Sequence, residues 1–161
     1  MSLDRLFEQL LLYIVGRVAI AAEAVNQAKE AATSVESVAE TKWDTFGLEN
    51  SYLAHGQAVR LAECEADLAY FRKFSFSDSE VIELGSVLLL SRSDGWQRIV
   101  IIAEHSGGGE FELDGEKALI VTPSTPLGKS LLLKEEGDEI LMKSRGVEID
   151  AEIAQIFMGQ V

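Results

Sequence analysis

Two rows of apolar residues, each repeating every seven positions, run through the start of the chain. One row is formed by Phe7, Ile14, Ala21, Ala28 and Val35, and the other by Leu11, Val18, Val25, Ala32 and Ala39. Two rows offset by three or four positions are the a and d positions of a heptad repeat, which place one apolar stripe along a helix. The pattern predicts a long helix that packs along this stripe.

A second and weaker heptad pattern extends from about Leu48 to Lys73. Its rows are Ala54, Leu61 and Leu68, and Cys64 and Phe71, with an interruption at Gln57. Between the two patterns stand Asp44, Thr45 and Gly47, residue types that end one helix and cap the next. A short connection between long helices predicts an antiparallel coiled-coil hairpin over residues 1–74.

The pattern changes after residue 74. Four short runs rich in Val, Ile and Leu are bounded by turns containing Gly or Asp, namely Val87–Leu90, Arg98–Ala103, Ala118–Val121 and Glu139–Met142. Such runs favour β-strands, and the segment 126–133 between two of them is typical of a short helix. The sequence therefore predicts an α+β protein, with the hairpin followed by a small antiparallel β domain over residues 75–161.

Composition narrows the classes of function. The chain has 161 residues, and its 14 Lys and Arg against 27 Asp and Glu give a formal net charge of −13. A surface this acidic repels phosphate backbones, so we expect no direct binding of nucleic acid by the surface as a whole. Cys64 is the single cysteine, which excludes an internal disulfide and is typical of a reducing, cytoplasmic protein.

The apolar segment from Leu6 to Ala22 is the candidate for a membrane helix. It is interrupted by Glu8, Gln9 and Arg17, whereas a spanning helix needs about 20 mostly uncharged residues. We expect a soluble helix and no membrane partner.

One motif imitates a nucleotide site. Gly128-Lys129-Ser130 matches the end of a phosphate-binding P-loop, but Pro123 stands where that loop needs its first glycine. Pro123 and Pro126 also lack the backbone N–H groups with which such a loop holds phosphate. The motif therefore favours a plain helix start.

Acidic residues gather around the predicted end of the hairpin. They are Glu36, Glu40, Asp44 and Glu49, with Trp43 and Phe46 among them. Asp44 is a good helix cap and the glutamates could form a solvated face. Two large aromatic residues at the end of a rod also suggest a surface that meets a partner. Both interpretations stay open on the residues alone.

Two stretches resemble the Gre-type transcript cleavage factors, a family that includes GreA and GreB. The run from Ala118 to Ile140, with Thr-Pro-Leu-Gly at 125–128 and Gly-Asp at 137–138, is similar to the signature of their FKBP-like C-terminal domain. Asp44 followed by Glu49-Asn50-Ser51-Tyr52 is similar to the run of Asp, Glu-Asn and Tyr at the tip of their coiled coil.

This resemblance implies a role in bacterial transcription. It implies that the globular domain docks on RNA polymerase while the hairpin enters the secondary channel, where Asp44 and Glu49 help to hold a catalytic Mg²⁺ that the polymerase itself mainly binds. The polymerase then cleaves its backtracked RNA, whose 3′ end the factor meets only indirectly. The chain would be an accessory factor and not an enzyme, acting as a cytoplasmic monomer. Mg²⁺ suits the role because it accepts one or two extra carboxylates while keeping several waters.

The sequence departs from the family pattern at the tip. The two acids of the family stand three residues apart, whereas Asp44 and Glu49 stand five apart, and Glu40 with Asp44 forms an alternative pair one helical turn apart. Basic residues on the coil are also few. These departures leave open a regulator that occupies the channel without stimulating cleavage.

Two further alternatives belong to other classes. The apolar start of the first helix, from Leu10 to Ile20, would suit a coiled-coil adaptor or a dimerisation element. A prolyl isomerase would need a pocket lined by aromatic residues, and the second domain offers few of them: Trp96, Phe111, Phe157 and Phe76.

Overall fold

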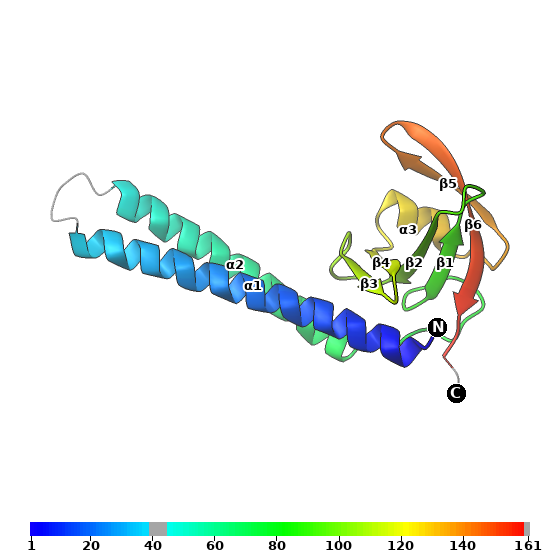
Figure 1. Cartoon of the computed structure of the whole chain (residues 1–161), viewed down its shortest axis with the longest axis horizontal. Helices are drawn as coiled ribbons and strands as arrows, with labels where there is room; N and C mark the ends of the chain where they lie inside the picture. The colour runs from blue at the N-terminus through cyan, green and yellow to red at the C-terminus, as the bar shows by residue number, and fades with distance from the viewer. Residues whose placement is uncertain (39–44, 160–161) are drawn as a thin grey trace. The chain divides into compact units, whose positions relative to one another are not determined.

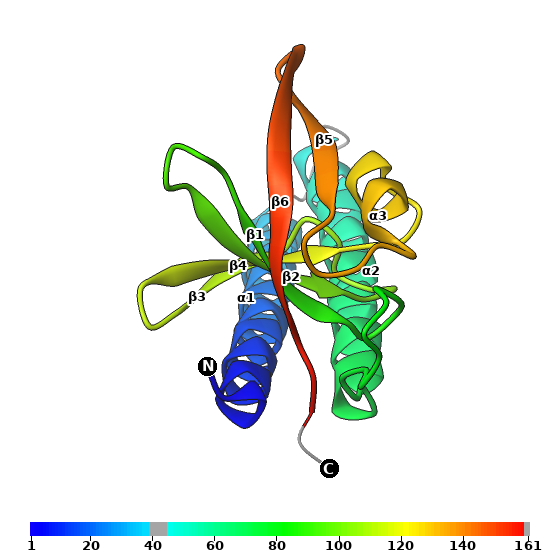
Figure 2. The same cartoon turned by 90° about the vertical axis from the view of Figure 1, so that its right-hand side faces the viewer.

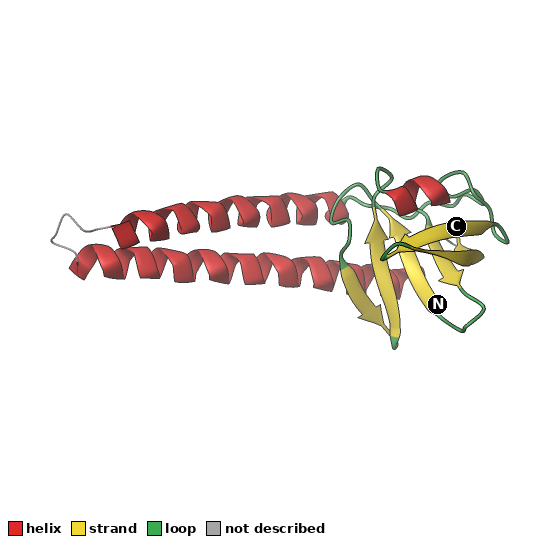
Figure 3. Cartoon of the chain, turned by 90° about the horizontal axis from the view of Figure 1, so that it is seen from above, coloured by secondary structure: helices red, strands yellow, loops and turns green. Residues whose placement is uncertain are grey.

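Two long helices come first in the chain and lie side by side, running in opposite directions (Figures 1 and 3). The structure is a computed structural model that describes residues 1–38 and 45–159. Helix α1 spans Leu3–Val38 and helix α2 spans Thr45–Arg72. Arg17 of α1 pairs with Asp67 of α2 at 3.6 Å. The predicted antiparallel hairpin is confirmed.

The buried seam between the helices follows the predicted rows over their described part. On α1 it is formed by Ile14, Ala21, Val25, Ala28 and Ala32, and on α2 by Cys64 and Phe71. Most of the α1 residues are alanine, and small side chains let two helices approach closely. The burial of these residues confirms the heptad pattern in this part of the hairpin.

Helix α2 begins earlier than the sequence predicts. Thr45 and Gly47, which we expected in the turn, are helical residues. A glycine inside a helix costs only about 1 kcal/mol relative to alanine, which the rest of a long helix outweighs. Glu40 and Asp44, the latter predicted as the cap of this helix, lie outside the described residues.

The chain divides into two compact units, and the first ten residues belong to the second domain. One unit comprises Met1–Leu10 with Lys73–Val161, and the other comprises Leu11–Arg72. Leu6 and Leu10, which stand on neither predicted row, are fully buried. The buried stripe of α1 therefore continues into its first turns, since Leu10 lies five full helical turns before Ala28 on the same side of the helix, and there it belongs to the globular unit.

Side-chain contacts hold these first turns in the globular unit. Arg5 pairs with Asp114 at 2.5 Å. The ring of Phe7 packs edge-on against Phe76, with 5.9 Å between centroids, and Phe76 packs in the same way against Phe74. The linker after α2 and the start of α1 thus share one aromatic cluster.

Leu10→Ala is expected to lower the free energy of unfolding of the globular unit by about 3 kcal/mol, because it removes a fully buried side chain and leaves a cavity. Leu12→Ala is the matched control, since Leu12 lies two residues away and is 62% exposed. It should change stability by less than about 0.5 kcal/mol. Chemical denaturation of the two variants would show this difference, and equal losses would contradict the burial of Leu10.

A six-stranded sheet forms the body of the globular unit (Figure 2). Its strands in chain order are β1 (Val87–Ser91), β2 (Gln97–Ile102), β3 (Glu110–Leu113), β4 (Glu116–Val121), β5 (Glu139–Ser144) and β6 (Val147–Phe157). Their spatial order is β3-β4-β2-β1-β6-β5. Helix α3 (Pro126–Leu131) follows β4.

The four predicted strands and the short helix are present, which confirms the α+β fold class. Two strands were not predicted, because β3 is a short edge strand rich in Glu and β6 mixes acidic with apolar residues along its length. The sheet is also not wholly antiparallel, since β2 and β4 pair in parallel. The chain leaves β2, turns back through β3 at the edge, and so enters β4 in the direction of β2.

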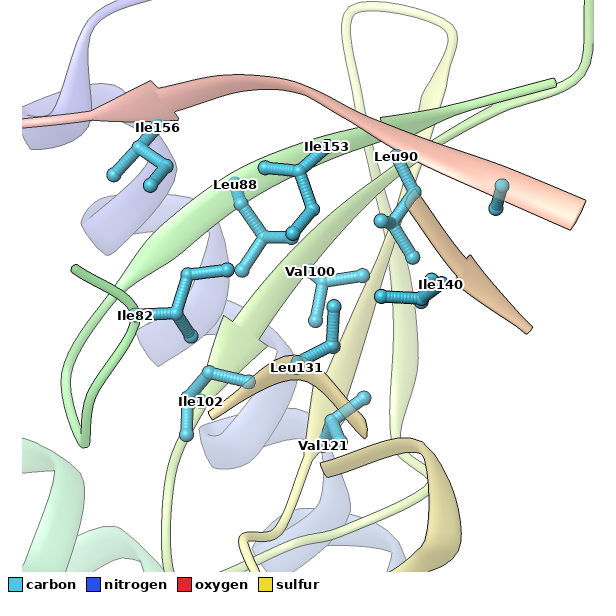
Figure 4. Packing of buried hydrophobic residues seen from close by; sticks show 11 residues of the cluster. Ile82, Leu88, Leu90, Val100, Ile102, Val121, Leu131, Ile140, Ile153 and Ile156 are labelled. Atoms are coloured by element: carbon cyan, nitrogen blue, oxygen red, sulfur yellow. The ribbon is translucent and has the colours of Figure 1, made fainter. Parts of the chain in front are cut away.

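The core of the sheet lies on the face that α3 covers (Figure 4). Leu88 and Leu90 of β1, Val100 and Ile102 of β2, and Leu131 of α3 belong to one buried cluster. On the other face Met1 lines a cavity together with Leu89, Ile99 and Leu113. The sheet therefore has cover on both faces. Helix α3 covers one face, and Met1 at the start of the chain lies beside residues of the other.

Candidate functional site

The described part of the predicted acidic site is the start of α2. Glu49 is the fifth residue of this helix and its side chain is exposed. Leu48, Tyr52 and Leu53 around it are also more than half exposed. An exposed carboxylate can bind a cation outside the protein. The structure thus places Glu49 on an open surface at the end of the hairpin.

The other predicted ligands cannot be placed beside it. Asp44 and Glu40 lie outside the described residues, as does Trp43. Within residues 1–38 and 45–159, no group of three or more His, Cys, Asp or Glu side chains is arranged to hold a metal ion.

The turn before α3 has a specific hydrogen-bonded geometry. The Thr125 hydroxyl accepts a hydrogen bond from the Gly128 N–H at 3.1 Å and donates one to the Thr122 carbonyl at 2.8 Å. Pro126 occupies the first turn of the helix, where its missing N–H costs nothing. This arrangement is a helix N-cap and holds residues 122–128 in one shape.

The same geometry excludes a P-loop. Gly128 is buried and its N–H is already bound to Thr125, so it has no donor for phosphate. The Ser130 hydroxyl donates to the Leu127 carbonyl at 2.7 Å inside the helix. Gly128 is needed for another reason, because a Cβ there would lie 2.0 Å from the Thr122 carbonyl oxygen.

Among the four aromatic residues named for a prolyl isomerase pocket, two lie on one cavity and Trp96 lies elsewhere. Phe76 and Phe157 line a cavity of about 870 Å³ beside the first four residues of the chain. Trp96 packs instead against the core cluster beneath α3. The arrangement gives no support to the prolyl isomerase alternative.

Three solved structures with low sequence identity to this chain were compared with it. One is the transcription factor Gfh1, with 18% sequence identity and a TM-score of 0.41 over 91% of this chain and 92% of that chain. A second is GreA factor homolog 1 (Gfh1) of Thermus thermophilus, with 17% identity and a TM-score of 0.38 over 91% and 94%. A third is the prokaryotic transcription elongation factor GreA/GreB from Nitrosomonas europaea. It has 17% identity and a TM-score of 0.37 over 58% of this chain and 77% of that chain.

Comparisons by sequence find no match: no family model and no curated protein matches the chain. Among the described helices, none is long and apolar enough to cross a membrane.

One cluster of charged and aromatic side chains was not predicted from the sequence. Arg92 and Arg98 both lie near the ring of Trp96, with their guanidinium carbons 5.7 and 5.5 Å from its centroid. Arg92 pairs with Asp94 at 2.9 Å, and Arg98 lies 3.6 Å from Glu110. The sequence could have indicated this cluster. A hairpin turn at Asp94-Gly95 places Arg92 opposite Trp96, and Arg98 follows Trp96 by two residues on the same strand face. Each arginine of the cluster is thus matched by an acid, so its charges balance.

Proposed function

We propose that this chain is a Gre-type transcription factor that binds bacterial RNA polymerase, with its globular unit docked and the hairpin in the secondary channel. The observation that carries the proposal is the pairing of an antiparallel hairpin with a mixed sheet whose β4–α3 turn has the capped Thr-Pro-Leu-Gly form. Glu49, exposed near the far end of the hairpin, supports it. The net charge of −13 favours a protein partner over nucleic acid.

In this function the chain supplies oxygen ligands and the polymerase performs the reaction. Asp44 and Glu49 are the proposed ligands, with Glu40 as an alternative to Glu49. An exposed carboxylate such as Glu49 suits Mg²⁺, a hard ion that takes one or two carboxylates and keeps its other positions for water and substrate. The bound ion would supply Lewis-acid chemistry for RNA hydrolysis together with the polymerase's own metal ion, one of the two activating the attacking water and the other steadying the leaving oxygen. The factor itself acts as a monomer in the cytoplasm.

The full chain is expected to bind bacterial RNA polymerase and to shorten the RNA of backtracked complexes in the presence of Mg²⁺. Binding should weaken as salt rises, because an acidic factor is attracted to a basic surface. Gel filtration of the mixture at two salt concentrations and electrophoresis of labelled RNA would measure both. Absence of binding at low salt would contradict the proposal as a whole.

A channel regulator without cleavage activity is the second candidate. The observation in its favour is the five-residue spacing of Asp44 and Glu49, where the family pattern has three. If the chain binds polymerase and alters elongation but yields no shortened RNA, this candidate replaces the first.

A further inference from the structure

A further row of residues with heptad spacing runs along α2, on the side opposite the seam of the hairpin. Its members recur at spacings of four, three, four, three and four residues and are Leu48, Tyr52, His55, Val59, Ala62 and Ala66. All six are exposed, and the exposed fractions of Leu48, Tyr52 and Val59 are 55%, 69% and 47%. We call these six residues the outer stripe. It differs from the seam of the hairpin in that nothing in the described part of this chain buries it.

The geometry of α2 separates the outer stripe from the seam. Successive residues turn by about 100° around a helix, so Val59 and Ala62 lie roughly 140° and 160° from the buried Cys64. Helix α1 packs on the side of Cys64 and therefore leaves the stripe open. A 4-3 repeat keeps its side chains facing a second helix that runs alongside, whereas a strand or an irregular loop has no matching repeat. The occupant that fits the stripe is thus another helix.

The charges beside the outer stripe determine which kind of partner helix would bind there favourably. Glu49 and Glu63 border one side and Glu65 borders the other, and all three are exposed. Arg72 is the one basic residue at these flanking positions, at the end of the helix. Flanking charges set partner choice in coiled coils, and like charges placed opposite each other are repulsive. A second copy of α2 would bring the same acids, whereas a helix flanked by Lys or Arg would meet them favourably.

We propose that the outer stripe docks an amphipathic helix of a partner protein whose flanking positions carry Lys or Arg. Leu48, Tyr52 and Val59 supply the apolar contacts, and Ala62 and Ala66 let the partner backbone approach closely at the other end. The net charge of −13 adds a longer-range attraction for such a helix. This inference rests on α2 alone and does not depend on the proposed function.

The test uses the full chain and a synthetic helical peptide of about four heptads with Leu at a and d and Lys at e and g. Fluorescence anisotropy of the labelled peptide should show binding that Val59→Glu weakens by about tenfold or more, since the change puts a charge into the docked seam. Ile20→Glu is the matched control. Ile20 is β-branched, lies on α1 and is 73% exposed, so this variant has the same net charge and should bind like the parent.

Two more peptides separate the contributions. A peptide with Glu at e and g, and one with Lys at e and g but Gln at a and d, should both bind at least about tenfold more weakly than the first. Equal weakening by Ile20→Glu, or equal binding of the three peptides, would overturn the proposal. A stable dimer of the full chain in sedimentation equilibrium that Val59→Glu dissociates would overturn it as well, in favour of a second copy as the occupant. Circular dichroism would verify that both variants remain helical.

Discussion

Asp44→Asn is expected to lower RNA cleavage in backtracked polymerase complexes by about 10- to 1000-fold, the loss that follows when a few kcal/mol of transition-state stabilisation is removed. Asparagine caps a helix as well as aspartate does, so the stability of the hairpin should change little. Binding to polymerase should also survive, because we place docking in the globular unit. Labelled RNA in stalled complexes measures cleavage, and thermal unfolding measures stability.

Further variants make this prediction specific. Glu49→Gln should show the same loss of cleavage with retained binding, and Glu40→Gln tests the alternative pair. Glu30→Gln is the matched control, since Glu30 is an exposed acid on α1 and should leave cleavage unchanged. If Asp44→Asn cleaves like the parent, Asp44 is only a helix cap. If the parent itself yields no shortened RNA, the chain is the silent regulator.

Gly128→Ala is expected to destabilise the globular unit by about 4 kcal/mol or more, at the upper end of what overpacking costs. The added Cβ would lie 2.0 Å from the Thr122 carbonyl oxygen and 2.9 Å from its carbon. Both are backbone atoms, so the capped turn from Thr122 to Gly128 would have to move and would lose the hydrogen bonds of Thr125. Urea denaturation with a tryptophan fluorescence readout suits the measurement because Trp96 packs against the same core.

Gly56→Ala is the matched control for this substitution and has the opposite expected sign. Gly56 lies inside α2, and a Cβ there would meet nothing within 4 Å. Alanine should therefore stabilise the helix by roughly 0.5–1 kcal/mol. If both alanine variants were as stable as the parent, the close contact at Gly128 would not constrain the turn.

The sequence predicted those features that depend on local periodicity. The rows at Ile14, Ala21 and Ala28 indicated the seam because a helix repeats its faces every 3.6 residues, whatever it packs against. The strands β1, β2 and β4 were evident because strands buried on both faces are short continuous apolar runs. The candidate tip residues came from a resemblance to a family and not from periodicity, and of these the structure places only Glu49.

Tertiary structure decided the features that depend on residues far apart in the sequence. The burial of Leu6 and Leu10 follows from packing with residues more than sixty positions later, in the unit that begins again at Lys73. The parallel pairing of β2 with β4 depends on the path of the chain through β3, which no local pattern encodes. The exposure of Leu48, Tyr52 and Val59 also needed the structure, because it depends on which side of α2 the helix α1 covers. Only the arrangement of the whole chain shows which side of α2 is covered by α1 and which side is left exposed.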